Sequence, residues 1–289
     1  MSATVLDKFV LSKPYFDPQG LIVAEEDERL LGFVHAGFGP APDLQSVVCE
    51  PGVINMLLVV PGPNWNSVAG DLLLQAETYL ANRGSRTAQT MSVSPTSPFY
   101  FGLYGGSDLR GVLQSDIRLL ELFKKHRYEQ QEHWTVLERN LEGFRPPVCR
   151  VQMGIRRSYH IEAGVEIPTH NWWEACTLGD VDRTMFSMSS NTTGQLVGTA
   201  TFWDVEPLAT SRQVAVVGLL DCQVSEPFRK QGLGTYLVAE SLRQLHTQNS
   251  TVAEAQVSTQ NVAAMRLLNK LGFREIDQTV LLRKTIASG

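Results

Sequence analysis

The stretch from Val224 to Gly234, VSEPFRKQGLG, decides the fold, because it joins a strand to a helix through a short glycine-containing turn. The residues before it, VAVVGLLDCQV at 214–224, are apolar and partly β-branched, which is typical of a buried strand. After the turn, small and apolar residues recur at helical spacing, at Leu237, Val238, Ser241, Leu242 and Leu245. The pattern predicts a strand, a turn and an amphipathic helix in direct succession.

The turn itself has the composition of a phosphate-binding site. Gly232 and Gly234 allow the backbone to approach a ligand closely, and Arg229 and Lys230 add positive charge. The first turn of the following helix offers unpaired N–H donors at its positive dipole end. A Rossmann loop would need a third glycine at position 237, and a Walker loop would need Lys and Ser or Thr after Gly234; the sequence has neither.

A second motif follows at 261–273, NVAAMRLLNKLGF. Asn261 is typical of a helix N-cap, and Gly272 is typical of a helix end. Between them, Ala264, Leu267 and Leu268 lie on one face of the predicted helix, together with Leu271. Taken alone, the two motifs also fit a pair of ordinary amphipathic helices in a βαβ protein.

Together, the two motifs resemble those of the GCN5-related N-acetyltransferase (GNAT) family, which transfers an acetyl group from acetyl-CoA to an amine. Residues 229–234 match its R/Q-x-x-G-x-G/A loop, and 261–273 resemble its N-x-x-A-x-x-L-Y-x-K-x-G-F segment. The resemblance implies an α/β (α+β) fold in which helices flank a mixed, mostly antiparallel central sheet. It implies acetyl-CoA contacts from Cys222, Gln223, Val224, Arg229, Lys230, Gln231, Gly232, Leu233, Gly234, Thr235 and Asn261.

The first half of the chain repeats the pattern of the second half. Gly32 precedes Val59 by 27 positions, and Gly198 precedes Val224 by 26. The offset between the copies falls from 165 to 145 further along, so the first copy has about 20 extra residues, within 92–113. Pro146 and Pro147 favour a boundary nearby, so we predict tandem domains at 1–144 and 145–289, similar to double GNAT proteins of the mycothiol synthase type.

In the first copy the phosphate loop has degenerated. Asn64 stands in the place of Arg229, and Ser67 puts a side chain in the place of Gly232. We expect this copy to be structural or to shape the substrate site, rather than to bind a second CoA. The extra segment contains Phe99, Tyr100, Phe101 and Tyr104; it either walls the acceptor pocket, packs as a loop or forms a dimer contact.

The resemblance also implies a mechanism for the second copy. The strand end 221–224 would separate from the strand at 252–258, pair with the pantetheine arm and offer a backbone N–H to the oxyanion. Asp221 falls where many family members carry an acidic residue, so it is the candidate general base; alternatively it caps a strand end or pairs with a cation. Cys222 could be a nucleophile, but a buried apolar cysteine is favoured.

Two features of the sequence depart from this scheme or remain ambiguous. Position 268 is Leu268, where the family has the tyrosine that protonates the departing thiolate, so no side-chain general acid is identified. Trp172 and Trp173 lie where the acceptor side is expected and could stack on an acceptor. Because adjacent residues point to different faces of a helix, at least one of them is expected to be in the core.

Composition limits the classes of partner. The net charge of −5 disfavours nucleic acid and anionic membranes, and no apolar stretch is long enough to span a bilayer. The four scattered cysteines and the unclustered histidines indicate no metal site, and the absence of a signal peptide indicates the cytoplasm. We expect a monomer or homodimer.

The expected activity is therefore direct transfer of an acetyl group from acetyl-CoA to an amine of a small molecule or peptide, in a ternary complex without metal. Two alternatives remain open at this stage. One is an acyltransferase that uses a longer acyl-CoA or a hydroxyl acceptor. The other is a non-catalytic acyl-CoA-binding module, which the substitution at Leu268 favours. The sequence does not identify the acceptor, because specificity in such folds lies in variable loops.

Overall fold

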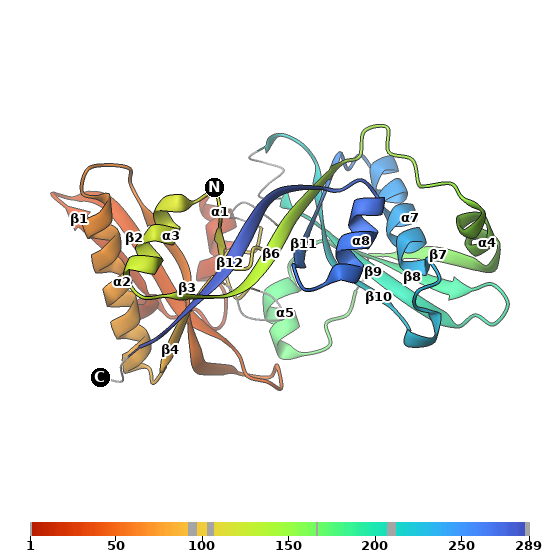
Figure 1. The fold of residues 1–289 in the computed structure, drawn as a ribbon. Coiled ribbons are helices and arrows are strands. Elements are labelled where there is room, and N and C mark those ends of the chain that lie inside the picture. The colour runs from red at the N-terminus through yellow and green to blue at the C-terminus, as the bar shows by residue number, and fades with distance from the viewer. Residues whose placement is uncertain (1, 92–96, 103–106, 166, 207–211, 287–289) are drawn as a thin grey trace.

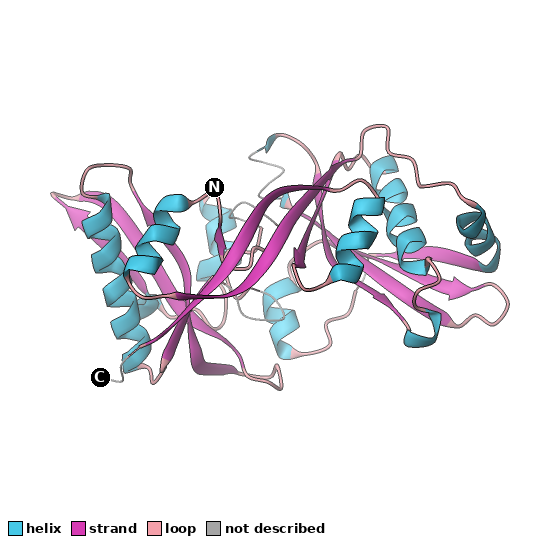
Figure 2. Cartoon of the chain, viewed as in Figure 1, coloured by secondary structure: helices cyan, strands magenta, loops and turns pink. Residues whose placement is uncertain are grey.

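A single 12-stranded sheet, flanked by helices, runs through the whole molecule (Figures 1 and 2). The computed structural model describes residues 2–91, 97–102, 107–165, 167–206 and 212–286. Most strand pairs are antiparallel; among the pairs within the described residues, β3·β4 and β10·β11 are parallel. The mixed, mostly antiparallel sheet with flanking helices confirms the predicted fold class, although the two copies share one continuous sheet.

The first copy contains the elements up to residue 140. They are α1 (Ala3–Leu6), η1 (Asp7–Leu11), η2 (Pro18–Gly20), β1 (Leu21–Glu26), β2 (Arg29–Pro40), β3 (Val47–Val59), α2 (Trp65–Asn82), β4 (Thr87–Thr90), β5 (Val112–Leu113), α3 (Ile117–Lys125) and β6 (Glu129–Asn140).

The second copy contains the elements from residue 150 onward. They are α4 (Arg150–Ser158), β7 (Tyr159–Gly164), α5 (Trp172–Leu178), β8 (Arg183–Ser190), β9 (Leu196–Asp204), β10 (Val216–Val224), η3 (Glu226–Phe228), α7 (Leu233–Thr247), β11 (Val252–Ser258), α8 (Val262–Lys270) and β12 (Arg274–Thr285).

Strand geometry confirms the internal duplication. In the first copy the parallel pairing of β3 with β4 ends at Ile54 and Thr90, and in the second copy that of β10 with β11 ends at Leu219 and Ala255. Ile54 and Leu219 are 165 positions apart, and so are Thr90 and Ala255. This is the offset between the two copies that the sequence shows. The two copies therefore repeat the same backbone arrangement at the point where the two strands separate.

A β-bulge lies at the same place in both copies. The register of β2 with β3 skips Asn55, and the register of β9 with β10 skips Leu220, again 165 positions later. A bulge places an extra residue in one strand and bends it away from its partner. The bulge thus accompanies the separation of the two parallel strands in each copy.

The two copies exchange their last strands. The strand order is β1-β2-β3-β4-β12-β6-β11-β10-β9-β8-β7. The edge formed by β4 is paired by β12 of the second copy, and the edge formed by β11 is paired by β6 of the first copy. In Figure 1, β6 and β12 run side by side across the middle of the molecule, and the end of β12 lies beside β4 of the first copy.

Because of this exchange, each of the two hydrophobic cores includes residues from both halves of the chain. The core beneath α7 includes Leu137 and Leu141, which belong to the first half of the chain. The core beneath α2 includes Val280 and Leu282 of β12. Each core is therefore completed by a strand from the opposite half. The boundary at 144/145 remains a prediction, and it divides the sequence rather than two independently packed domains.

A third apolar cluster lies between the two copies. It combines Phe9 and Val10 from the N-terminal segment with Phe99 and Phe101 of the extra segment and with Trp203 of β9. The Phe101 and Trp203 rings stack with centroids 4.3 Å apart. The segment before β1 packs here against residues of both halves.

Candidate functional site

A cavity of about 820 Å³ opens where β10 and β11 separate beyond Leu219 and Ala255. Its wall continues past the bulge to the loop before α7, and α8 closes the opposite side. Beyond Leu219, β10 has no strand partner on the side facing β11, although the Val224 carbonyl accepts from Arg229 and the Cys222 N–H donates to Asp221. The arrangement can hold an extended ligand that runs from the sheet to the start of a helix.

The loop at the start of α7 keeps its backbone donors available. Gly232 has φ +86°, a left-handed conformation that favours glycine, and it forms the N-cap without a side-chain hydrogen bond to the helix. Gly234 lies close to α8, where an added Cβ would come within 3.2 Å of Leu267. Arg229 donates from Nε to the Val224 carbonyl at 2.8 Å, which ties the loop to the strand end. These features fit an anion at the helix N-terminus.

Most of the predicted contact residues line this one cavity. The residues placed there are Asp221, Cys222, Val224, Arg229, Lys230, Gly232, Leu233, Gly234, Thr235 and Asn261. Gln223 and Gln231 do not line it; Gln231 donates to the Pro227 carbonyl instead. Asn261 caps α8 by accepting from the Ala264 N–H at 3.1 Å, as predicted.

Sequence reasoning missed two cations on α8. Arg266 and Lys270 line the cavity four residues apart, on the same helical face as Ala263. With Arg229 and Lys230 on the other side, they provide positive charge on both walls. The i, i+4 spacing of Arg266 and Lys270 was a usable signal, because it puts both on the face opposite the buried Leu268.

Sequence reasoning also missed three cavity-lining residues of the neighbouring strands β11 and β6. Gln256 and Ser258 of β11 line the cavity, and so does Trp134 of β6. Trp134 is opposite Ser258 in the antiparallel register, and the Arg110 guanidinium lies over its ring at 4.4 Å. Trp134 lies in the other half of the chain, so only the strand exchange brings it here.

Asp221 and Cys222 differ in what they can do. Asp221 is solvent-exposed, yet the cavity walls remove part of its hydration and raise its pKa; hydrogen bonds from the Gln223 side chain and Cys222 backbone oppose this rise. Burial raises the pKa of the Cys222 thiol to about 12, with a contribution from the Asp221 charge. A thiol that resists ionisation is a poor nucleophile, so the structure favours the buried apolar role for Cys222.

Leu268 lines the cavity with 1% of its surface exposed, and its side chain has no ionisable group that could act as a general acid.

Trp173 is fully buried and Trp172 is partly exposed, which confirms that one of the pair is in the core. Both rings contact Tyr15 and neither lines the cavity. The tryptophans therefore serve packing between the copies.

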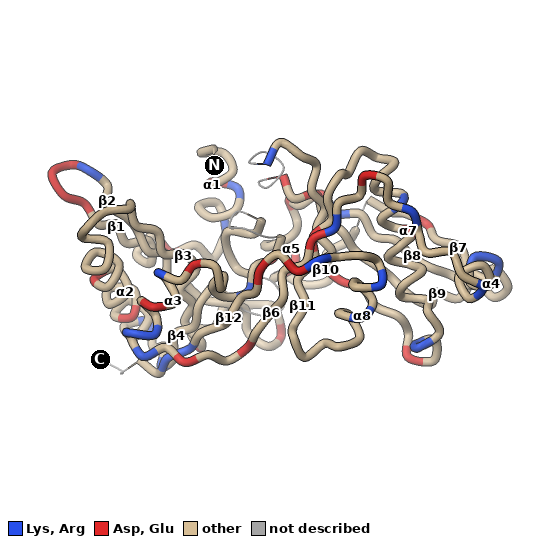
Figure 3. Tube along the Cα trace, turned by 45° about the horizontal axis from the view of Figure 1, so that its top comes forward, with Lys and Arg blue, Asp and Glu red and all other residues tan. Residues whose placement is uncertain are grey.

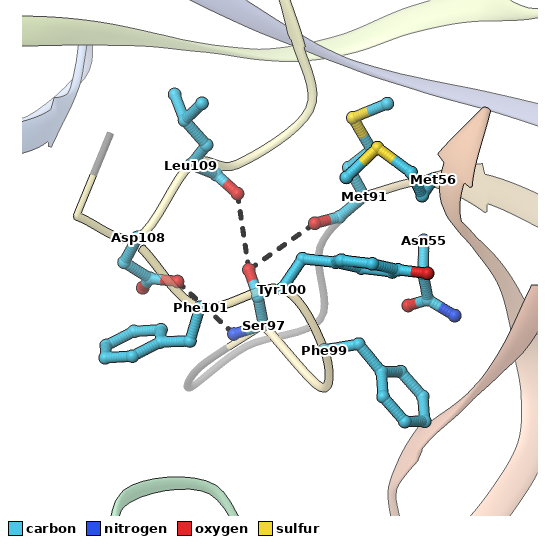
Figure 4. Close-up of a pocket in the computed structure, with 9 residues that line it drawn as sticks. All are labelled: Asn55, Met56, Met91, Ser97, Phe99, Tyr100, Phe101, Asp108 and Leu109. Carbon is cyan, nitrogen blue, oxygen red and sulfur yellow. Dashed lines mark hydrogen bonds between the residues drawn. The ribbon is translucent and has the colours of Figure 1, made fainter. Parts of the chain in front are cut away.

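In the first copy, the corresponding gap is filled by protein. Beyond Ile54 and Thr90, the space between β3 and β4 is occupied by Phe99, Tyr100 and Phe101 of the extra segment, and only about 20 Å³ remains (Figure 4). Hydrogen bonds tie the two ends of the extra segment together: the Ser97 hydroxyl reaches the Leu109 carbonyl at 3.2 Å, and the Ser97 N–H reaches Asp108 at 3.3 Å. The Ser97 hydroxyl also lies 3.4 Å from the carbonyl of Met91, which follows β4.

Of the three interpretations of the extra segment, the structure shows a packed loop for its described part; Tyr104 lies outside the described residues. His35 of β2 locks this loop in place. Its Nδ1 lies 3.1 Å from the Tyr100 hydroxyl, and its ring packs edge-on against Phe16 and Phe99. Burial lowers the pKa of His35 to about 4, so the ring is neutral at pH 7.

Charge elsewhere is unevenly distributed. Acidic residues gather at the turn between β1 and β2, and basic residues gather on α4 at the far end of the molecule (Figure 3). Within the described residues, no three His, Cys, Asp or Glu side chains are grouped so as to hold a metal ion. No described helix is both long and apolar enough to cross a bilayer.

Three solved structures share the architecture over nearly the whole chain. A tandem GNAT protein from the clavulanic acid biosynthesis pathway has a TM-score of 0.65 at 16% identity, covering 92% of this chain and 82% of that one. A GCN5-related N-acetyltransferase from Sphaerobacter thermophilus has a TM-score of 0.59 at 16% identity, covering 94% and 82%.

The third is a GCN5-related glucosamine N-acetyltransferase region of a fungal multi-domain β-N-acetylglucosaminidase, with a TM-score of 0.67 at 14% identity, covering 97% of this chain and 36% of that one. No curated protein is similar enough in sequence to match the chain. The acetyltransferase (GNAT) family model matches residues 152–273, which include β10, the phosphate loop, α7, β11 and α8. Residues 152–273 therefore belong to the acetyltransferase (GNAT) family, whose members are acyltransferases, and the whole chain is a tandem protein of the GNAT fold.

Proposed function

We propose that this chain is an N-acetyltransferase that uses acetyl-CoA at a single site in its C-terminal copy. The observation that carries the proposal is the continuous cavity from the separated strands β10 and β11 to the uncapped start of α7. A pyrophosphate needs backbone N–H donors and cations, and a pantetheine arm needs unpaired main-chain groups along a strand. The cavity has the strand main chain, the cations and the helix N–H donors one after another along its length.

In this proposal, the backbone N–H groups from Gly232 to Thr235 bind the pyrophosphate, together with Arg229 and Lys230. Arg266 and Lys270 face the same cavity from α8. They add positive charge for the phosphate group of CoA that is not part of the pyrophosphate. The main chain at 222–224 pairs with the pantetheine arm and offers an N–H to the thioester oxygen. Bound acetyl-CoA supplies an activated acetyl group; the residues described here bind and orient it.

Asp221 is the proposed general base. An amine must attack as a free base, so a proton has to leave it before or during attack. A carboxylate whose pKa is raised toward neutrality holds that proton more readily than an ordinary surface aspartate. The acceptor is a small-molecule or peptide amine that attacks directly in a ternary complex, and the protein is a monomer or homodimer.

The leaving thiolate has no side-chain acid at position 268. A thiol has a pKa of about 8.5, so the thiolate is a good leaving group that can depart without a side-chain acid and take its proton from solvent. The aliphatic Leu268 nevertheless favours one other candidate, a non-catalytic module that binds acyl-CoA without transferring the acyl group.

Measuring acetyl-CoA binding and acetyl transfer on the same protein separates these candidates. Calorimetry with acetyl-CoA measures binding, and thiol release with a panel of primary amines measures transfer. The proposal predicts tight binding and amine-dependent CoA release. Tight binding with no release above the amine-free rate across the panel would support the binding module, and no binding of acetyl-CoA or longer acyl-CoA would overturn both.

A further inference from the structure

A row of apolar side chains crosses the outer strands of the first copy on the side away from α2. Val23 of β1 is opposite Phe33 of β2, and Phe33 is opposite Leu58 of β3. Val34 and Leu57, the next residues along β2 and β3, pack in the core beneath α2, so the row lies on the other face of the sheet. Val23 and Leu58 are 52% and 41% exposed, although a sheet face of this kind is normally covered.

The turn beside this apolar row is strongly acidic. Glu25, Glu26, Asp27 and Glu28 stand together there, and Arg29 is the single cation of the turn. All five side chains are exposed, and none of them forms an ion pair with another described residue. The apolar row and this turn are called the acidic end below; Figure 3 shows its charge at the β1–β2 turn.

Helix α4 has the complementary features at the opposite end of the molecule (Figures 1 and 3). Arg150, Met153 and Arg157 follow one another at intervals of three and four residues, so they share one side of the helix, called the basic face below. All three are exposed, and the buried residue of α4 is Ile155. The helix contains no acidic residue, and neither arginine of the basic face is in an ion pair within the part of the chain that the structure describes.

The acidic end and the basic face match in both polarity and charge. A helix laid across a bare sheet face is the usual way to bury that face, as α2 does on the other side of the same strands. An exposed apolar patch bordered by charge is typical of an interaction site, and opposite charges on two surfaces favour their association. Since the two surfaces lie at opposite ends of the molecule, one chain cannot join its own pair.

We propose that the basic face of α4 in one copy binds the acidic end of a second copy, with Met153 against the apolar row and the two arginines facing the acidic turn. The occupant of the bare sheet face is therefore another molecule of the same chain. Two copies related by a twofold axis form this contact twice and close as a homodimer. Assembly of this kind does not depend on acetyl transfer.

Sedimentation equilibrium of the full-length protein tests the contact. We expect the average mass to rise from one chain toward two as concentration increases, and the dimer to weaken with added salt, which screens exposed charges. Arg150→Glu with Arg157→Glu, or Glu26→Lys with Glu28→Lys, should weaken dimerisation by roughly tenfold or more. The chain with all four substitutions has exchanged the charges of its two surfaces and should dimerise again. A mixture of the two reversed variants should form heterodimers, although neither dimerises well alone.

Lys124→Glu with Lys125→Glu is the matched control. It makes the same change in net charge on α3, whose buried side chains pack beneath α2 on the other side of the sheet, and it should dimerise as the wild-type protein does. A wild-type protein that keeps the mass of one chain at every concentration would overturn the proposal. So would a dimer that withstands either reversal, equal weakening by the control, or no recovery in the chain with four substitutions. Calorimetry with acetyl-CoA tests the proposed function separately.

Discussion

At the scale of single residues, the proposed function makes ligand binding depend on Gly232. We predict that Gly232→Glu abolishes acetyl-CoA binding, since it places bulk and negative charge at the backbone donors of the phosphate loop. An added Cβ would meet Val151 and Ile155 at no less than 3.5 Å, so the fold has room for it. Calorimetry on the folded variant measures the effect.

Gly194→Glu is the control for backbone strain. Gly194 has φ +69° and no atom within 4 Å of an added Cβ, so a side chain there carries the same left-handed cost of about 1–2 kcal/mol without touching the cavity. It should bind acetyl-CoA normally. Equal affinity in the two variants would show that Gly232 is not at the phosphate site.

Asp221 makes a prediction about pH. A raised carboxyl pKa means that the general base is protonated, and inactive, over a wider acidic range, so activity should rise as pH increases through that pKa. Asp221→Asn should lower turnover with little change in acetyl-CoA affinity, and the acidic limb should disappear. A pH–rate profile for each protein decides this; an unchanged limb in Asp221→Asn would leave Asp221 a structural carboxylate.

The same pKa shift fixes the sign of a stability effect. A carboxyl that binds its proton more tightly in the folded than in the unfolded state stabilises the fold when protonated, and this contribution is lost as pH rises through the raised pKa. Asp221→Asn should therefore not destabilise the protein at pH 7. Activity loss without stability loss separates a functional from a structural role.

The residues of the phosphate loop and the N-cap Asn261 could be predicted from sequence because they act through local backbone geometry. Trp134 could not, because its place in the cavity depends on which strand pairs with β11. A sequence pattern fixes which face of a strand is apolar but not which edge it joins.

At the scale of elements, the exchange of β6 and β12 makes each half depend on the other. Leu282 of β12 is 3% exposed and packs in the core beneath α2. We predict that Leu282→Ala destabilises the protein by about 2–5 kcal/mol. Hydrogen exchange should show the loss of protection in β2, β3 and α2, although residue 282 belongs to the second copy in sequence.

Leu137→Ala is the reciprocal variant, because Leu137 of β6 packs beneath α7. Its loss of protection should appear in β10, β11 and α7. If each variant instead loosened only the copy to which its residue belongs in sequence, the exchange would be contradicted. Both strands are 12 residues long with similar burial patterns, so nothing in their sequences tells which sheet edge each one joins.

At the scale of the whole molecule, acid should weaken the fold through His35. Its pKa is about 6.5 when exposed and about 4 in the folded protein, so the unfolded chain takes up a proton first as pH falls. Stability should decline between these two values by an amount on the order of 1–3 kcal/mol. In His35→Gln, denaturant unfolding from pH 7 to 4 should lose most of this decline; an unchanged decline would assign the acid sensitivity to other groups.

The central claim about the whole molecule is a division of labour between two copies of one fold. Both copies separate their parallel strands at equivalent positions, but only one leaves space there, about 820 Å³ against about 20 Å³. The first copy also has Asn64 and Ser67 where the second has Arg229 and Gly232. Losing one charged hydrogen bond of about 1.5–3 kcal/mol would weaken binding at least tenfold even in an open gap.

Titration of the full-length protein with acetyl-CoA by isothermal calorimetry tests this claim most directly. The account predicts saturation near one equivalent in the wild-type protein and no tight binding in Gly232→Glu. Saturation at two equivalents of similar affinity, or a remaining tight site in Gly232→Glu, would contradict it.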